Sequence, residues 1–244
     1  MNPTSHPTTA PTAVLIHGAF ADASGFTGII RELSGAGHEV LAPPNPLRGV
    51  AIDAAAVRAV VTGVEGPVVL VGHSYGGAAI TQASADLENV IGIVYLAAFA
   101  PAAGESCASV QEPFPPSLLA STIRPTPYDA VGAVGGPDLL IDKGQFRETF
   151  CADVPIDLAA TMSVSQRPLA AAAIGEPLSA EGWSTRPTWY QIATRDNAIA
   201  PEAQRFMASR MNATINEIDG SHTSFIARPV QAAAFVVRAL ESLS

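Results

Sequence analysis

The chain has 244 residues, 48% of them hydrophobic and 14% charged, with a formal net charge of −9. This length can bury the core of one α/β domain, and this composition excludes a disordered protein. The acidic balance argues against nucleic acid and anionic membrane surfaces as partners, and no apolar run is long enough to span a membrane without a polar residue or a proline.

The chain begins with a segment, residues 1–11, that is rich in proline and threonine. This segment lacks the basic start and the apolar core of a signal peptide. We therefore expect a flexible tail on a cytoplasmic protein.

Strands and helices are predicted to alternate over residues 12–100. The expected strands are Thr12–His17, His38–Ala42, Val68–Val71 and Val90–Ala97, and the expected helices are Ala23–Ser34, Ala51–Val64 and Ala78–Leu87. Strands this continuously apolar are typical of a parallel sheet that is covered on both faces. The order predicts a doubly wound α/β fold whose ligands bind at the carboxyl ends of the strands.

The alternation stops over residues 101–186. Prolines cluster here, no strand-like run remains, and short helices are expected at Gly144–Phe150, Pro155–Thr161 and around Arg167–Ile174. The segment is too apolar for a linker, and the strand pattern resumes after it. We predict a helical insertion over the catalytic face, called the cap segment below, rather than a separate domain.

The sheet resumes after the cap segment with two more strands, Thr188–Ala193 and Thr214–Ile218. A helix at Pro201–Met211 lies between them, and Pro229–Leu243 forms the closing helix. Residues 12–100 and 187–244 together predict a core with a mostly parallel sheet of about six strands.

The sequence Gly72-His73-Ser74-Tyr75-Gly76 lies between an expected strand and an expected helix. A serine on such a sharp turn has strained backbone angles, and glycines on both sides avoid clashes with neighbouring side chains. The five residues alone also fit an ordinary glycine-rich turn. The strand before and the helix after favour a nucleophile elbow, with Ser74 as the nucleophile.

A serine hydroxyl needs a histidine base, and His222 is the best candidate because it follows the last strand at the carboxyl edge of the sheet. The acid that orients this base is predicted to be Asp196, which follows the penultimate strand. Its rivals are Asp219, which is too close to His222 along the chain, and Glu105. The other histidines are assigned elsewhere: His6 to the tail, His38 to a structural role, His17 to backbone hydrogen bonds, and His73 to a direction away from Ser74.

The oxyanion hole is expected to use the backbone N–H groups of Tyr75 and Ala19. The apolar cap segment and the acidic charge favour a small to medium, uncharged, partly hydrophobic substrate. We expect Phe20, Phe114 and Trp183 to contact this substrate, although Phe114 and Trp183 also fit an ordinary cap core.

No cofactor is expected, because no cluster of histidine, cysteine and carboxylate residues has the spacing of a metal site and no glycine-rich phosphate loop is present. The two cysteines, Cys107 and Cys151, are too few for a disulfide scaffold. Two reduced thiols are the favoured interpretation, and a single bridge between them stays open.

These motifs resemble those of the α/β-hydrolase superfamily, and more narrowly of the plant methylesterase and hydroxynitrile lyase group with its bacterial esterase relatives. The resemblance rests on His17-Gly18-Ala19, Gly72–Gly77, Leu96–Pro101, Thr194–Asp196 with Pro201-Glu202, and Asp219–His222, and more weakly on Phe150-Cys151 and Gln166–Leu169. The order of Ser74, Asp196 and His222 is the order of this superfamily.

Two departures from the lyase pattern favour the esterases. The plant lyases carry a threonine at the position of Gly18 and a lysine just after the catalytic histidine, where this chain has Thr223. A serine nucleophile also disfavours the related dehalogenases and epoxide hydrolases, which use aspartate. The resemblance therefore implies a carboxylesterase. A lactonase, an acyltransferase, a perhydrolase and a non-catalytic ligand-binding protein remain as alternatives, and a homodimer is left open.

Overall fold

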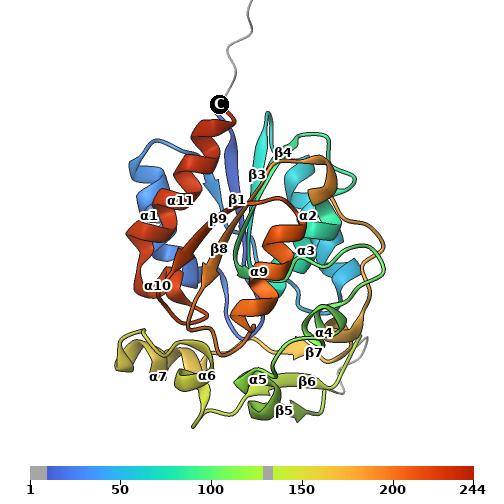
Figure 1. Cartoon of the computed structure of the whole chain (residues 1–244), viewed down its shortest axis with the longest axis vertical. Helices are drawn as coiled ribbons and strands as arrows, with labels where there is room; N and C mark the ends of the chain where they lie inside the picture. The colour runs from blue at the N-terminus through green and yellow to red at the C-terminus, as the bar shows by residue number, and fades with distance from the viewer. Residues whose placement is uncertain (1–9, 129–133) are drawn as a thin grey trace, which may run out of the picture.

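The computed structural model describes residues 10–128 and 134–244 (Figure 1), so most of the expected tail lies outside the described residues. Within them, six strands form one parallel sheet in the order β2-β1-β3-β4-β8-β9. The strands are β1 (Thr12–Ile16), β2 (Val40–Leu41), β3 (Val68–Ser74), β4 (Val90–Ala98), β8 (Thr188–Ala193) and β9 (Thr214–Ile218). The predicted doubly wound fold is confirmed.

Helices cover both faces of the sheet because its strands carry apolar side chains on both sides. In β1, Ala13 and Leu15 join the core beneath α1 (Thr27–Gly35) and α11 (Pro229–Ser242), whereas Val14 and Ile16 join the core beneath three other helices. Those helices are α2 (Val50–Thr62), α3 (Tyr75–Ser84) and α9 (Pro201–Arg210). Figure 1 shows α1 and α11 on one side of the sheet and α2 and α3 on the other.

The first helix differs from the prediction in its opening turn. Residues Ala23–Phe26 form a 3-10 turn, η1, and its N-cap residue Asp22 accepts the backbone N–H of Ser24 with its carboxylate. The α-helix begins only at Thr27.

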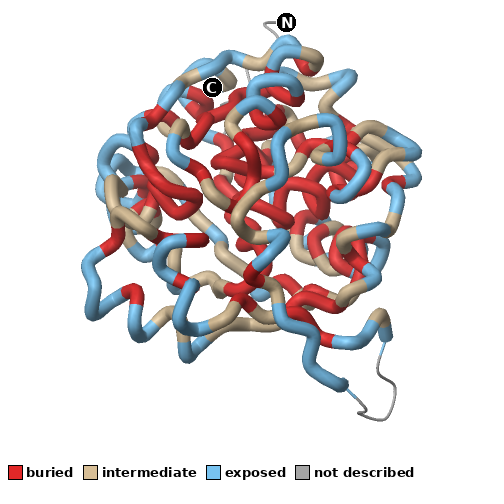
Figure 2. Tube along the Cα trace, turned by 60° about the horizontal axis from the view of Figure 1, so that its bottom comes forward, coloured by how far each residue is buried: buried red, intermediate tan, exposed pale blue. Residues whose placement is uncertain are grey.

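Most of the cap segment lies at one end of the sheet, at the bottom of Figure 1, and its last residues return toward the opposite end, where Arg186 donates to the carbonyl oxygen of Val90 at the start of β4. Its helices are α4 (Cys107–Gln111), α5 (Leu118–Thr122), α6 (Phe146–Phe150), α7 (Ile156–Val164) and α8 (Ala172–Gly175), followed by the 3-10 turn η2 (Trp183–Thr185). Figure 2 shows that buried residues concentrate in the middle of the molecule, whereas exposed residues prevail around its rim.

The prediction that strands are absent from the cap segment is wrong. Three strands of its described part form a small antiparallel sheet in the order β5 (Ile123–Thr126), β6 (Asp138–Ile141) and β7 (Leu169–Ala170). The edge strand β5 contains Pro125, which lacks a backbone N–H, and β7 has only two residues. Strands this short, with a proline at the edge, carry little of the alternating pattern that sequence reasoning depends on.

Both cysteines are buried and free, which agrees with the interpretation as two reduced thiols. Burial raises the pKa of the Cys151 thiol to about 12, so this group stays protonated at neutral pH. None of the described helices is both long enough and apolar enough to cross a membrane.

Candidate active site

Ser74 stands at the junction of β3 and α3 with a backbone φ of +54° and ψ of −130°. A positive φ is rare for a residue with a side chain and costs roughly 1–3 kcal/mol, so the surrounding structure must hold it in place. The side chain is 7% exposed and lines a cavity. The turn therefore presents the hydroxyl as the elbow motif predicts.

Two glycines allow the neighbouring backbone to approach Ser74 closely. A Cβ on Gly76 would lie 2.3 Å from the carbonyl oxygen of Ile16, and a Cβ on Gly18 would lie 2.6 Å from the Cβ of Ser74. Atoms cannot approach this closely without a shift of the backbone. Glycine at these positions is thus a condition for the geometry of the turn.

Asp196 and His222 meet at the same edge, with Oδ2 of the carboxylate 2.7 Å from Nδ1 of the ring. The other oxygen of Asp196 accepts the backbone N–H groups of Ala198 at 2.7 Å and Ile199 at 2.9 Å. The amide of Gln204 also donates to Oδ2 at 2.8 Å. These donors compensate a carboxylate that is fully buried, with 0% of the Asp196 side chain exposed.

This contact assigns the tautomer of His222. Since a carboxylate accepts hydrogen bonds, Nδ1 carries the proton and Nε2 keeps a free lone pair. Nε2 is shielded from solvent and has no hydrogen-bond partner among the described residues. A ring held in this way can accept a proton from a hydroxyl group brought up to Nε2.

His73 supports the loop that carries His222, a role that sequence reasoning missed. Its Nε2–H donates to the backbone carbonyl of His222 at 3.0 Å, and the two rings lie 4.6 Å apart between centroids. Burial lowers the pKa of His73 well below its ordinary value, so the ring is neutral. The rings of His73 and Phe225 also lie 4.6 Å apart between centroids. Because side chains of neighbouring residues in a strand point to opposite faces, the sequence could have predicted which face of the sheet His73 occupies.

The two expected oxyanion donors, Ala19 and Tyr75, line the same cavity as Ser74. Tyr75 is the first residue of α3, where a backbone N–H has no acceptor within its own helix. The turn before Ala19 is fixed by His17, whose Nδ1 bonds the Gly18 carbonyl and whose Nε2 accepts the Asn45 N–H, both at 2.9 Å. The prediction that His17 bonds to backbone is confirmed.

The cavity beside Ser74 has a volume of about 370 Å³. Its wall is mostly apolar, and Glu112 is the one charged residue among the described residues that line it. Phe20 and Phe114 line it, together with Phe99, Leu119, Ile123 and Ile174. An uncharged and partly hydrophobic ligand suits this wall.

Trp183, the third aromatic residue expected at the substrate, does not line this cavity. Its indole N–H donates to the carbonyl of Pro101 at 3.2 Å, and the guanidinium of Arg210 lies 5.5 Å from its ring centroid. Trp183 packs against the core cluster of α2, α3 and α9. The position of Trp183 therefore matches the alternative interpretation, an ordinary structural role.

Asp153, just after α6, connects the cap segment to the loop of His222. It accepts hydrogen bonds from the backbone N–H of Ser221 at 3.1 Å and from the Ser221 hydroxyl, and it pairs with Arg228. Burial acts to raise the pKa of Asp153, but the hydrogen bonds from Ser221 and Arg228 outweigh it and lower the pKa. No motif marks Asp153, because its partners are 68 and 75 residues away along the chain.

Within residues 10–128 and 134–244, no group of three or more histidine, cysteine or carboxylate side chains could hold a metal ion.

Comparisons with known proteins identify the family and the fold. The sequence model of the alpha/beta hydrolase family matches residues 13–235 of this chain. A curated protein from Phoma sp., named "Probable hydrolase R7", is 28% identical over 221 residues, which covers 80% of this chain and 82% of that protein.

Two solved structures show the same fold over nearly the whole chain. A pyrethroid hydrolase from Sphingobium faniae is 21% identical, with a TM-score of 0.78 and coverage of 96% of this chain and 98% of that one. A methylesterase from Arabidopsis is 18% identical, with a TM-score of 0.79 and coverage of 96% and 100%. The resemblance that the motifs indicate is confirmed.

Proposed function

The chain belongs to the alpha/beta hydrolase family, and from this premise we propose that it is a serine carboxylesterase. Its substrates are small to medium esters that are uncharged and partly hydrophobic. The observation that carries the proposal is the Asp196–His222 pair at the same edge of the sheet as a strained Ser74, beside an apolar cavity. We further propose that the cap segment supplies the cover of this cavity.

The reaction begins when Oγ of Ser74 attacks the ester carbonyl while Nε2 of His222 takes its proton. Asp196 keeps the ring in place and stabilises the charged imidazolium. The backbone N–H groups of Tyr75 and Ala19 bind the oxyanion of the tetrahedral intermediate. His222 then passes the proton to the leaving alcohol, and an acyl group remains on Ser74.

The second half of the reaction releases the acid. His222 takes a proton from a water molecule, which attacks the acyl carbonyl, and a second tetrahedral intermediate forms in the same oxyanion hole. This intermediate collapses, the proton moves from His222 to Oγ of Ser74, and the carboxylic acid leaves. No cofactor takes part in either half.

The test is the hydrolysis of p-nitrophenyl acetate and butyrate by a Ser74→Ala variant. We expect kcat to fall by about 10³-fold or more, because the nucleophile is gone, while the circular dichroism spectrum stays unchanged. Ser84→Ala is a matched control, since Ser84 is also buried in α3 and its hydroxyl donates to the carbonyl of Thr81. Equal turnover by Ser74→Ala and the wild type would refute the proposal.

A further inference from the structure

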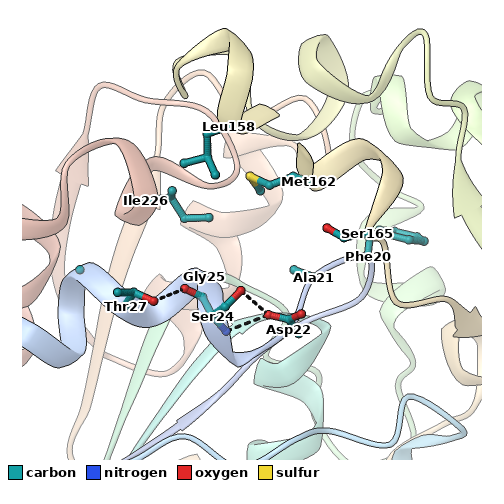
Figure 3. Close-up of a pocket in the computed structure, with 11 residues that line it drawn as sticks. Phe20, Ala21, Asp22, Ser24, Gly25, Thr27, Leu158, Met162, Ser165 and Ile226 are labelled. Atoms are coloured by element: carbon teal, nitrogen blue, oxygen red, sulfur yellow. Dashed lines mark hydrogen bonds between the residues drawn. The ribbon is translucent and has the colours of Figure 1, made fainter. Parts of the chain in front are cut away.

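A second cavity, of about 320 Å³, lies between α7 and the segment that contains η1 (Figure 3). Leu158 and Met162 of α7, together with Ile226 of α10 (Ser224–Ala227), form its apolar side. The opposite side carries polar groups that are already paired, since Asp22 accepts both the backbone N–H and the hydroxyl of Ser24. The residues that line this cavity do not include the proposed triad, Ser74, Asp196 and His222, or the proposed oxyanion donors.

Phe20 is the one described residue that lines both this cavity and the cavity of Ser74. It directly follows Ala19, which places it beside the oxyanion hole. Figure 3 shows its ring at the border of the second cavity, next to Ser165. Phe20 thus borders two spaces of similar size, and its ring is called the partition below.

Two contacts and a buried position hold this partition in place. The backbone N–H of Phe20 donates to the carbonyl of Arg167 at 2.9 Å, and the ring packs edge-to-face on Phe150 with centroids 6.1 Å apart. The side chain is only 4% exposed. The φ of +62° is uncommon for an aromatic residue and persists only where the surroundings impose it.

We propose that Phe20 is a specificity-determining residue that sets the upper size of the ester by closing the second cavity to the substrate. This inference rests on the proposed esterase function. The cavity of Ser74 holds about 370 Å³, and the ring of Phe20 ends the space available to a bound substrate on that side. Without the ring, the two cavities join, and the extra 320 Å³ accepts a longer ester.

The experiment compares kcat/KM for two ester series, one with lengthening acyl chains on p-nitrophenol and one with lengthening alcohols on butyric acid. In a Phe20→Gly variant, we expect the ratio of kcat/KM for the long over the short ester to rise about tenfold or more in at least one series. Glycine adopts the φ of +62° without strain. The ratio is the readout because any loosening of Ala19 slows short and long esters alike.

Two further variants sharpen the test. Met162→Ala widens the second cavity without touching the partition, so its ratio should equal that of the wild type. In a Phe20→Gly background, Met162→Trp refills the second cavity and should cancel the gain. If Phe20→Gly does not fold, Phe20→Leu, which keeps an apolar side chain but removes the ring, should give a smaller gain in the same direction.

The two proposals fail in different ways. An unchanged ratio in folded Phe20 variants that still hydrolyse the short ester would overturn the partition and leave the esterase function standing. Loss of the esterase function itself appears as equal turnover by the wild type and Ser74→Ala on the short ester.

Discussion

The carboxylate of Asp196 has both oxygens occupied by hydrogen-bond donors, and only one of those donors is the ring of His222. Oδ1 takes the N–H groups of Ala198 and Ile199, while Oδ2 takes His222 and Gln204. The carboxylate that orients the ring of His222 is therefore itself held in place by three other hydrogen bonds. The position of the proton on His222 therefore depends on one atom of Asp196, Oδ2, which accepts the Nδ1–H of the ring.

An Asp196→Asn variant tests this sensitivity. An amide can turn its NH₂ toward the ring, which then carries its proton on Nε2 and cannot act as a base. We expect kcat to fall by about 10⁴-fold with little change in structure. Asp219→Asn is the control, because the Asp219 side chain is 77% exposed and pairs with Arg195 at 2.7 Å. Similar activity in the two variants would contradict the assignment of the acid.

Gly18 offers a second test at this scale, since a side chain there meets the nucleophile. A Cβ at Gly18 would lie 2.6 Å from the Cβ of Ser74 and 2.8 Å from the carbonyl oxygen of His73. We expect Gly18→Ala to lower kcat about 100-fold, because a displacement of even 1 Å misaligns the reacting groups. Gly35→Ala in α1 is the matched control, since a Cβ there meets no atom within 4 Å. The comparison fails if both variants keep full activity.

At the scale of elements, the long strands and the loops after them were predictable from the sequence. Continuous apolar runs such as Val68–Val71 mark buried parallel strands, and their carboxyl ends bring Ser74, Asp196 and His222 to one edge. The strands β5 to β7 were not predictable, because they are short and lack alternation. The supporting roles of His73 and Asp153 were not predicted for a different reason. Their hydrogen-bond partners are far away along the chain, and no local sequence pattern indicates such contacts.

Asp153 links two elements and gives a prediction for stability against pH. In the folded chain its pKa lies below the ordinary value of 3.8, with burial opposing the hydrogen bonds that lower it. The stabilisation is therefore present above pH 3.8 and is lost as the pH falls through the folded pKa. We expect Asp153→Asn to lower the free energy of unfolding by about 1–3 kcal/mol at pH 7.

Urea unfolding at pH 7, 5 and 3.5 measures this effect. The difference between the wild type and Asp153→Asn should shrink at the lowest pH, which lies below the ordinary pKa of 3.8, because the unfolded wild-type chain then takes up a proton at Asp153 more readily than the folded chain does. Asp86→Asn is the control, because the Asp86 side chain is 73% exposed and its nearest contact with Arg58 is 3.9 Å. A difference that stays constant over this range would show that the charge of Asp153 does not contribute.

At the scale of the whole molecule, the close-packed core predicts how the thiols react. Cys151 is 0% exposed, and burial raises its pKa to about 12. In a Cys107→Ala variant, the remaining thiol should react with a disulfide reagent only as fast as the whole chain unfolds. The check is the labelling rate against the unfolding rate at several urea concentrations. Rapid labelling in the absence of urea would show that the region around Cys151 opens locally.

The bonds between Asp153 and the loop of His222 also bear on the route by which a substrate enters and a product departs. Residues 146–154 hold Ser221 through Asp153 and hold Asn197 through the carbonyl of Glu148, to which the Asn197 amide donates at 2.9 Å. An outward movement of this stretch would displace the loop of Asn197 and the loop of Ser221, which carry Asp196 and His222. We therefore expect substrate and product to pass by α4 and α5, whose residues border the Ser74 cavity, because this route leaves those bonds intact.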